Sequence, residues 1–187
     1  MSVDDMKRRA AAAALELVEP GMKLGLGTGS TAAFFVEALG AKIAEGLEVI
    51  GVPTSEATRQ QAESLNIPLT TLDDVPYLDL TVDGADEIDG ALRAIKGAGG
   101  AMLREKVVAA ASARMLVIAD GSKRVAAIGA AKIPVETLPF ARNFVAARLE
   151  NLGAQVALRE NFLTDQGNSI LDCSFAPDID HRRLAAE

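Results

Sequence analysis

The chain has 187 residues, of which 49% are hydrophobic and 24% charged, so it can form one globular domain with a small appendage. Its net charge of -7 disfavours binding to nucleic acid or to anionic membranes, and a small-molecule ligand is expected instead. No apolar run reaches the roughly 18 residues of a membrane span, and the N-terminus lacks the pattern of a signal peptide. The single cysteine, Cys173, cannot form an internal disulfide, and we expect a cytoplasmic protein.

Strands and helices are predicted to alternate along residues 1–130. This alternation is typical of a parallel sheet with helices on both faces. We therefore predict an α/β protein whose residues 1–130 form a Rossmann-like catalytic domain around an open, mostly parallel sheet. Helices are expected at 2–18, 31–45, 53–65 and 98–112, and strands at 22–26, 47–52, 68–72, 78–82 and 115–119.

The pattern changes from residue 131 onward. Two strands flank a polar turn at 164–168, which predicts a hairpin. Residues 131–187 are therefore expected to form a small α+β lid subdomain of ferredoxin-like type, truncated at its C-terminal end. Its strands are expected at 133–138, 154–159 and 169–173, and its helices at 142–152 and 178–187.

The segment 27–32 reads Gly-Thr-Gly-Ser-Thr-Ala and lies between a predicted strand and a predicted helix. Glycines let the backbone approach an anion closely, and the start of a helix supplies N–H groups with a partial positive charge. The spacing also fits a G-x-G-x-x-A dinucleotide site, but no acidic residue ends the next strand, as that site requires. The hydroxyls of Thr28, Ser30 and Thr31 favour a small phosphate, while a turn without any ligand is the alternative.

Residues 83–89, Asp-Gly-Ala-Asp-Glu-Ile-Asp, follow a predicted strand and carry four carboxylates. Ligands of open α/β sheets bind at the carboxyl ends of the strands, which makes these side chains candidates for a site. A solvated acidic loop is an equally simple interpretation. A Mg²⁺ site is less favoured, although this ion needs no histidine.

Two further segments at predicted strand ends carry cations. The first, 96–101, reads Lys-Gly-Ala-Gly-Gly-Ala and is followed by Arg104, Glu105 and Lys106 on the next helix. The second, 119–123, reads Ala-Asp-Gly-Ser-Lys. Taken alone, Glu105 would be interpreted as a surface residue that pairs with a nearby lysine.

The four segments, in this order, resemble ribose-5-phosphate isomerase of the A type, from about residue 4 to residue 175. The resemblance implies an aldose–ketose isomerase of the pentose phosphate pathway, which interconverts ribose 5-phosphate and ribulose 5-phosphate through an enediolate. It also implies that neither a metal nor an organic cofactor is needed, and that the protein is a homodimer or a tetramer. Its partner would be a small sugar phosphate.

The resemblance also assigns roles to residues of this sequence. Glu105 matches the base that moves a proton between C2 and C1, and Lys96 matches the cation beside the developing oxyanion. Asp83 and Asp86 match the pair that handles hydroxyl protons and assists ring opening. Substrate contacts are expected from Thr28, Gly29, Ser30, Thr31, Asp83, Gly84, Ala85, Asp86, Lys96, Gly97, Ala98, Gly99, Lys123 and Lys7.

Two other functions would use a related fold. A sugar-phosphate sensor would keep the first glycine-rich turn without needing Glu105 together with Lys96. A transferase acting on coenzyme A would need a nucleophilic glutamate and a larger site. His181, the only histidine, lies outside all four segments and is expected to be an exposed terminal residue.

Overall fold

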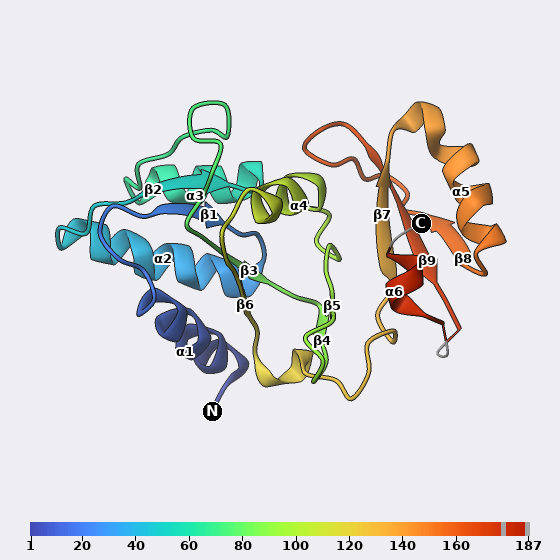
Figure 1. Ribbon diagram of the computed structural model, residues 1–187, viewed down its shortest axis with the longest axis horizontal. Helices are drawn as coiled ribbons and strands as arrows, with labels where there is room; N and C mark the ends of the chain where they lie inside the picture. The colour runs from blue at the N-terminus through green and yellow to red at the C-terminus, as the bar shows by residue number, and fades with distance from the viewer. Residues whose placement is uncertain (177–178, 186–187) are drawn as a thin grey trace. The chain divides into compact units, whose positions relative to one another are not determined.

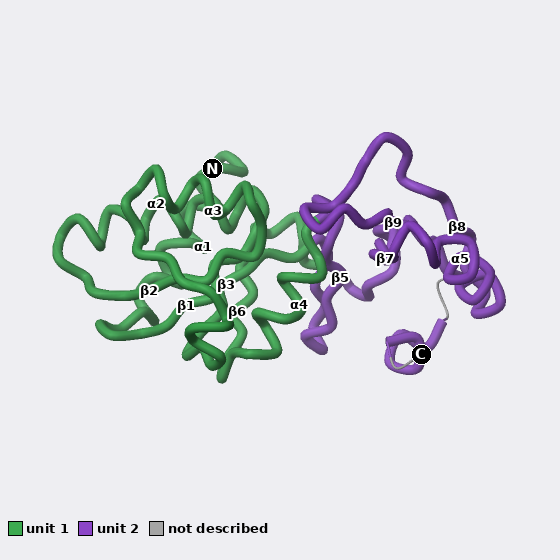
Figure 2. Tube along the Cα trace, turned by 90° about the horizontal axis from the view of Figure 1, so that it is seen from above, with its two compact units in different colours: residues 1–85, 101–124 green, residues 86–100, 125–187 purple. Residues whose placement is uncertain are grey.

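The computed structural model describes residues 1–176 and 179–185. It divides into two compact units, the first formed by residues 1–85 and 101–124 and the second by residues 86–100 and 125–187 (Figure 2). No helix among the described residues is long and apolar enough to cross a membrane.

The first unit contains a sheet of four parallel strands in the order β2-β1-β3-β6 (Figure 1). In this register Leu26 lies opposite Val82, and Gly84 lies opposite Ile118. Because the strands are parallel, the segments that follow β1, β3 and β6 all leave the sheet at its carboxyl edge. The strands are β1 (Lys23–Leu26), β2 (Ile50–Pro53), β3 (Leu80–Gly84) and β6 (Met115–Ile118).

Helices cover both faces of this sheet. Leu24 and Leu26 of β1 are buried in one core with Phe35 of α2, whereas Gly25, which points to the other face, lies against Val108 of α4. A Cβ at Gly25 would come within 2.6 Å of Val108, so glycine lets α4 pack closely on the strand. The helices are α1 (Val3–Leu15), α2 (Ser30–Ala44), α3 (Glu56–Ser64), α4 (Leu103–Ala110) and the short η1 (Gly121–Lys123).

The second unit contains an antiparallel sheet of three strands in the order β7-β9-β8, with helix α5 packed on it. The core between them holds Leu171 and Cys173 of β9 against Val145 and Leu149 of α5. A two-stranded hairpin, β4-β5, also belongs to this unit. The elements are β4 (Glu87–Ile88), β5 (Ala94–Ile95), β7 (Ile133–Thr137), η2 (Pro139–Ala141), α5 (Arg142–Asn151), β8 (Gln155–Leu158), β9 (Ser169–Ser174) and α6 (His181–Leu184).

The predicted fold class, a parallel sheet with helices on both faces and a small α+β part, is confirmed. The strand expected at 68–72 is wrong: the segment makes only one bridge, between Leu69 and Gly51. The helix expected from residue 98 begins at Leu103, because Gly100 has φ +92° and Met102 has φ -145°, neither of which is helical. Of the helix expected at 178–187, residues 181–184 are helical, and residues 178, 186 and 187 lie outside the described residues.

The two compact units differ from the expected division at residue 130, because residues 86–100 group with the C-terminal part of the chain. Two contacts within the second unit explain this grouping. The N–H of Val125 donates to the carbonyl of Ile88. The buried carboxylate of Glu87 accepts the N–H groups of Gly129 and Ala131, each at 2.7 Å. An acidic residue after β3 therefore anchors a loop more than 40 residues further along the chain.

Candidate active site

The turn after β1, residues 27–31, is held against the end of β3. The N–H of Thr28 donates to Oδ1 of Asp83 at 3.1 Å, and the N–H of Gly84 donates to the same oxygen at 2.7 Å. A Cβ at Gly27 would lie 2.3 Å from that oxygen, so only glycine permits this approach. Gly29, with φ +113°, is the N-cap of α2, and Ser30 is exposed at the start of that helix. The turn therefore presents N–H and hydroxyl donors where an anion can bind.

Four hydroxyl side chains form a cluster behind this turn. Oγ1 of Thr28 lies 2.7 Å from Oγ1 of Thr54, 2.8 Å from Oγ of Ser55 and 3.1 Å from Oγ1 of Thr58. Thr58 also donates to the carbonyl of Gly27 at 3.0 Å. The sequence interpretation treated 53–55 only as the start of a helix and missed this cluster. Two hydroxyl residues directly after β2, the strand beside β1, were the available signal, with Thr58 one turn into the next helix.

Three buried carboxylates belong to the first unit, those of Asp83, Glu105 and Asp120. Asp83, at the end of β3, has an exposed fraction of 0%, and Glu105, in the first turn of α4, has one of 6%. The sequence alone allowed Glu105 to be a surface residue, and its burial removes that interpretation. Carboxylates are rarely buried without a structural or chemical reason.

Asp120, at the end of β6, is buried and lies within the electrostatic influence of two lysines. Oδ1 of Asp120 accepts the N–H of Ser122 at 2.9 Å and its hydroxyl, which caps the short helix η1 that carries Lys123. These bonds to Ser122, together with the charges of Lys123 and Lys7, hold the pKa of Asp120 below its usual value despite burial. Lys7 reaches this position from α1 with only 15% of its side chain exposed. The structure thus brings together Lys7 and Lys123, which are 116 residues apart in the sequence.

The second unit carries the lysine loop, residues 96–100, and Asp86. Gly97 and Gly100 have φ values of +96° and +92°, in the region that favours glycine. The N–H of Ala98 donates to Oδ2 of Asp86 at 2.9 Å. Asp86 and the lysine loop were both predicted as site residues, and within this unit they are in contact.

The other two acidic residues of the segment 83–89 have structural partners. Glu87 anchors the loop at 129–131, as described above. Asp89 accepts the N–H groups of Ala91 and Arg93 and forms an ion pair with the Arg93 guanidinium at 2.7 Å. The interpretation of the segment as a solvated acidic loop is therefore wrong. Across the described residues, no group of three or more His, Cys, Asp or Glu side chains is arranged to hold a metal ion.

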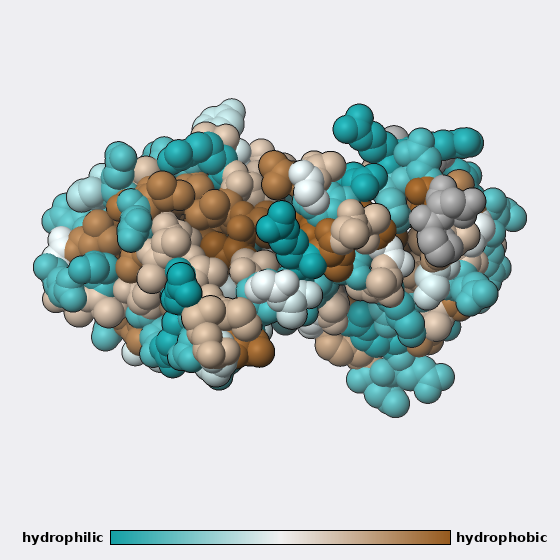
Figure 3. Space-filling model, turned by 90° about the horizontal axis from the view of Figure 1, so that it is seen from below, coloured by the Kyte–Doolittle hydropathy of each residue, from teal (hydrophilic) through white to brown (hydrophobic). Residues whose placement is uncertain are grey.

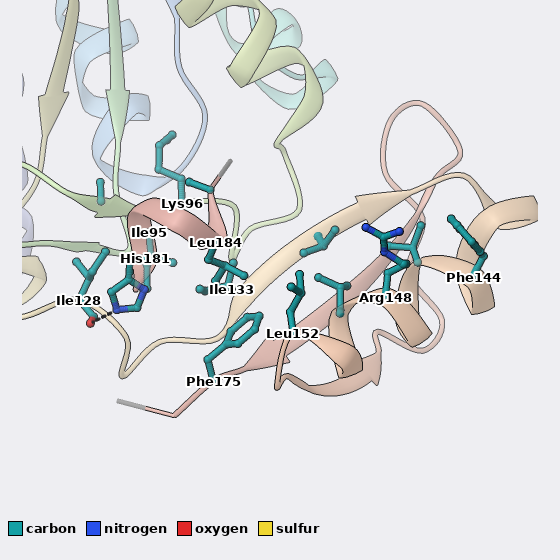
Figure 4. A pocket seen from close by; sticks show the side chains of 15 residues that line it. Ile95, Lys96, Ile128, Ile133, Phe144, Arg148, Leu152, Phe175, His181 and Leu184 are labelled. Atoms are coloured by element: carbon teal, nitrogen blue, oxygen red, sulfur yellow. Dashed lines mark hydrogen bonds between the residues drawn. The ribbon is translucent and has the colours of Figure 1, made fainter. Parts of the chain in front are cut away.

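A cavity of about 660 Å³ lies within the second unit between the β7–β9 sheet, α5 and α6 (Figure 4). Its lining is mostly aliphatic and aromatic, with Lys96, Arg148 and His181 as the polar members. His181 is half-buried, and its Nε2 lies 3.1 Å from the carbonyl oxygen of Ile128. The expectation that this histidine is an exposed terminal residue is therefore wrong.

The predicted site residues thus form two groups. The first unit holds the turn at 27–31, Asp83, Gly84, Ala85, Glu105, Lys123 and Lys7; the second holds Asp86, Lys96, Gly97, Ala98 and Gly99. Each group combines anion-binding donors or a cation with a carboxylate. Such a combination can bind an anionic substrate and move protons on it.

The chain is similar to proteins of one family. The family model for ribose 5-phosphate isomerase A (phosphoriboisomerase A) matches residues 50–187. A ribose-5-phosphate isomerase A from Parvibaculum lavamentivorans is 54% identical, over 96% of this chain and 84% of the relative. A solved structure of D-ribose-5-phosphate isomerase in complex with phospho-erythronic acid superposes with a TM-score of 0.94 at 36% identity, over 98% of this chain and 84% of the other.

A second solved structure, of ribose 5-phosphate isomerase A from Methanocaldococcus jannaschii, has a TM-score of 0.93 at 40% identity, again over 98% of this chain and 84% of the other. The sequence match and the structural match therefore extend over nearly the whole chain. The chain belongs to the ribose-5-phosphate isomerase A family.

Proposed function

We infer that Glu105 is the base with which this aldose–ketose isomerase moves a proton between C2 and C1 of ribose 5-phosphate. The observation that carries this inference is the burial of Glu105 in the first turn of α4. In the forward direction its carboxylate takes the proton from C2 of the open aldose, which leaves an enediolate. The same proton is then returned to C1, and the ketose forms without any co-reactant.

The lysine loop stabilises the enediolate oxygen. Lys96 supplies a positive charge, and the backbone N–H groups of Gly97 and Gly99 supply donors that are fixed before the reaction. The N–H of Ala98 bonds to Asp86 in the structure, so it reaches the substrate only if that bond is exchanged. We therefore assign the donor role to the N–H groups of Gly97 and Gly99 and not to that of Ala98.

Asp83 and Asp86 handle the hydroxyl protons. O1 gains a proton and O2 loses one, so the first transfer needs a proton donor and the second an acceptor close to the sugar; a carboxyl group can serve as either, according to its protonation state. Oδ1 of Asp83 already accepts two backbone N–H groups, which fixes the orientation of the carboxylate. The loop atoms of Gly84 and Ala85, next in the chain, complete the contacts to the sugar.

The phosphate binds at the turn 27–31 together with Lys123 and Lys7. The N–H groups at the start of α2 and the hydroxyls of Ser30 and Thr31 are its donors. The two lysines, whose charges both act on Asp120, supply positive charge to the phosphate in a protein whose net charge is -7. Local cations thus offset the repulsion that the whole protein exerts on an anionic sugar.

The test is Glu105→Gln, which keeps the size of the side chain and removes its ability to take a proton. We expect ketose formation from ribose 5-phosphate to fall at least about a hundredfold, with sugar-phosphate affinity nearly unchanged. The exposed Glu48→Gln is the matched control and is expected to keep wild-type activity. Full activity of Glu105→Gln would contradict the role of the base. A wild type that binds the sugar phosphate without turnover would instead indicate a sensor.

The oligomeric state and the cellular location are proposals as well. We expect a homodimer, as the resemblance implies, and a cytoplasmic location, which the single cysteine supports. Exposed apolar surface supports an association of this kind: Phe140 and Phe144 are 101% and 70% exposed, and hydrophobic side chains also gather on the face of the first unit shown in Figure 3. Light scattering at several concentrations tests the dimer, and a monomer throughout would contradict it.

A further inference from the structure

Arg159 follows strand β8 in the second unit and is bonded to strand β9 through both its backbone and its side chain. Its N–H donates to the carbonyl of Ile170 at 2.9 Å, which extends the pairing of β8 with β9 by one residue. Its guanidinium forms a bidentate ion pair with Asp172 of β9, with Nε 2.9 Å from Oδ2 and Nη2 bonded to Oδ1. Both side chains are largely buried, with exposed fractions of 21% and 17%. The position of the guanidinium is therefore fixed.

The remaining edge of the guanidinium faces the lysine loop. Nη1 of Arg159 donates to the carbonyl of Ala98 at 2.9 Å. A guanidinium has five N–H donors in a rigid plane, so it can bind a carboxylate with one edge and a carbonyl with another. A lysine at this position could not make the same three bonds, because its ammonium group is a single point on a flexible chain.

Both peptide groups that flank the Ala98 side chain are thus engaged. Its carbonyl accepts from Arg159, and its N–H donates to Asp86. None of the described residues has a cis peptide bond, and in a trans peptide the C=O and the following N–H point in opposite directions. With the carbonyl held by Arg159, the N–H of Gly99 points to the other side of the loop. A Cβ at Gly99 would meet nothing within 4 Å, so the space beside the Cα of this residue is open.

The end of the lysine loop packs against the same segment of chain. A Cβ at Gly100 would lie 2.3 Å from the ring of Phe162, and the guanidinium of Arg159 lies 5.4 Å from the centre of that ring. Gly97 and Gly100 lack side chains that could restrict the loop, so its conformation depends on contacts of this kind. Residues 159–162 form a support for the loop.

We propose that Arg159 is a positioning residue of the isomerase, which orients the lysine loop so that the N–H of Gly99 is aimed at the oxygen of the enediolate. Arg159 does not touch the substrate in this account and acts through Ala98. The inference rests on the role given above to the lysine loop. A misdirected donor weakens the transition state more than the bound substrate, because the charge on the oxygen develops only during the reaction.

A purely structural role would give a different result. If the ion pair with Asp172 only joined β8 to β9, its loss would lower the thermal stability and the fraction of folded enzyme, and the folded enzyme would keep its kcat. The pair Arg93–Asp89 offers a matched control in the same unit. It also joins a guanidinium to a buried carboxylate, at 2.7 Å, in the hairpin β4-β5 and its turn.

The experiment compares Arg159→Lys and Arg159→Met with Arg93→Lys, measuring kcat, KM for ribose 5-phosphate and the melting temperature of each protein. For both Arg159 variants we expect kcat to fall at least about tenfold while KM changes less than about threefold, a loss specific to the transition state. Arg93→Lys is expected to lower the melting temperature and leave kcat within about twofold. An Arg159→Lys enzyme with wild-type kcat would overturn the proposal.

A second measurement covers the case in which the Arg159 variants are poorly folded. Arg159→Ala is assayed with and without about 20 mM guanidinium, with sodium at equal ionic strength as the control; the free cation can occupy the gap between Asp172 and Ala98. We expect guanidinium to restore part of kcat, and no restoration in a folded variant would overturn the proposal. Absence of activity in the wild type would instead refute the isomerase assignment itself, so the two failures are distinguishable.

Discussion

The backbone N–H of Thr28 donates a hydrogen bond of 3.1 Å to Oδ1 of Asp83, so the turn after β1 is fixed to the carboxylate that ends β3. This contact requires glycine at position 27, and Gly27→Ala is expected to separate the two segments. Overpacking at a rigid backbone position costs about 1–3 kcal/mol. We expect a lower melting temperature and a raised KM for ribose 5-phosphate. Gly90→Ala is the control, because a Cβ there meets no atom within 4 Å; equal effects of both substitutions would contradict the interpretation.

The hydroxyl cluster behind the turn gives a second prediction. Thr58→Val keeps the shape of the side chain and removes the bonds from Oγ1 to the carbonyl of Gly27 and to Thr28. Leaving buried polar partners unsatisfied costs about 1–3 kcal/mol, and the turn loses its support. Urea unfolding and steady-state kinetics are expected to show lower stability and a raised KM. Thr58→Ser retains the hydroxyl and is expected to recover most of both; if it behaves like valine, the hydroxyl is not the cause.

The carboxylate of Asp120 predicts a pH dependence of stability. Its pKa is lowered in the folded protein by its bonds to Ser122, with Lys123 and Lys7 contributing. A lowered pKa means that the ionised form stabilises the folded state. This contribution is present above the ordinary value of 3.8 and is lost as the pH falls through the folded value. Asp120→Asn is therefore expected to lower the urea midpoint at pH 7, with a difference from wild type that shrinks below that ordinary value. The exposed Asp73→Asn should show no such difference at either pH.

Much of the fold could be predicted because the first unit obeys local rules. Short apolar strands alternate with helices that have clear start signals, such as the Ser2 cap of α1 and the Ser55 cap of α3. The prediction of a strand at 68–72 was wrong for a physical reason. The backbone of this segment bonds to β2 on both sides of Leu69, through Pro68 and Thr70, and then turns away at Thr71, whose hydroxyl bonds to Asp74. The apolar pattern of a strand does not reveal how many residues pair.

The candidate site also has parts that the sequence predicts and parts that it does not. Motifs made of consecutive residues, such as the turn at 27–31 and the lysine loop, could be recognised in the sequence. The supporting residues could not, because their roles arise from contacts over long distances along the chain. Arg159 lies 61 residues from Ala98, and Glu87 lies 42 residues from Gly129. Within the segment 83–89, only the structure shows that Glu87 bonds to the loop at 129–131 and that Asp89 pairs with Arg93.

Removal of divalent metal ions gives a further test of the proposed chemistry. Proton transfer by Glu105 and charge stabilisation by Lys96 require no metal. We therefore expect kcat and KM to stay within about twofold of their starting values after dialysis against EDTA, since a metal that polarised the substrate would contribute several kcal/mol. Added Mg²⁺ or Mn²⁺ should give no increase. A loss of activity that one of these ions restores would contradict the metal-free mechanism and reopen the role of the carboxylates.

The thiol of Cys173 provides a probe of the second unit. Burial, with the nearby charge of Asp172, raises its pKa from 9.0 to about 11, and its exposed fraction is 0%. At pH 8 only about one thiol in a thousand would then be ionised, and the thiolate is the reactive form. We expect Ellman's reagent to react slowly with the native protein and within minutes after unfolding in urea. Cys173→Ala, which removes the only cysteine, should give no signal in urea. A fast stoichiometric reaction of the native protein would show that β9 opens readily, and that the core between β9 and α5 is not closed.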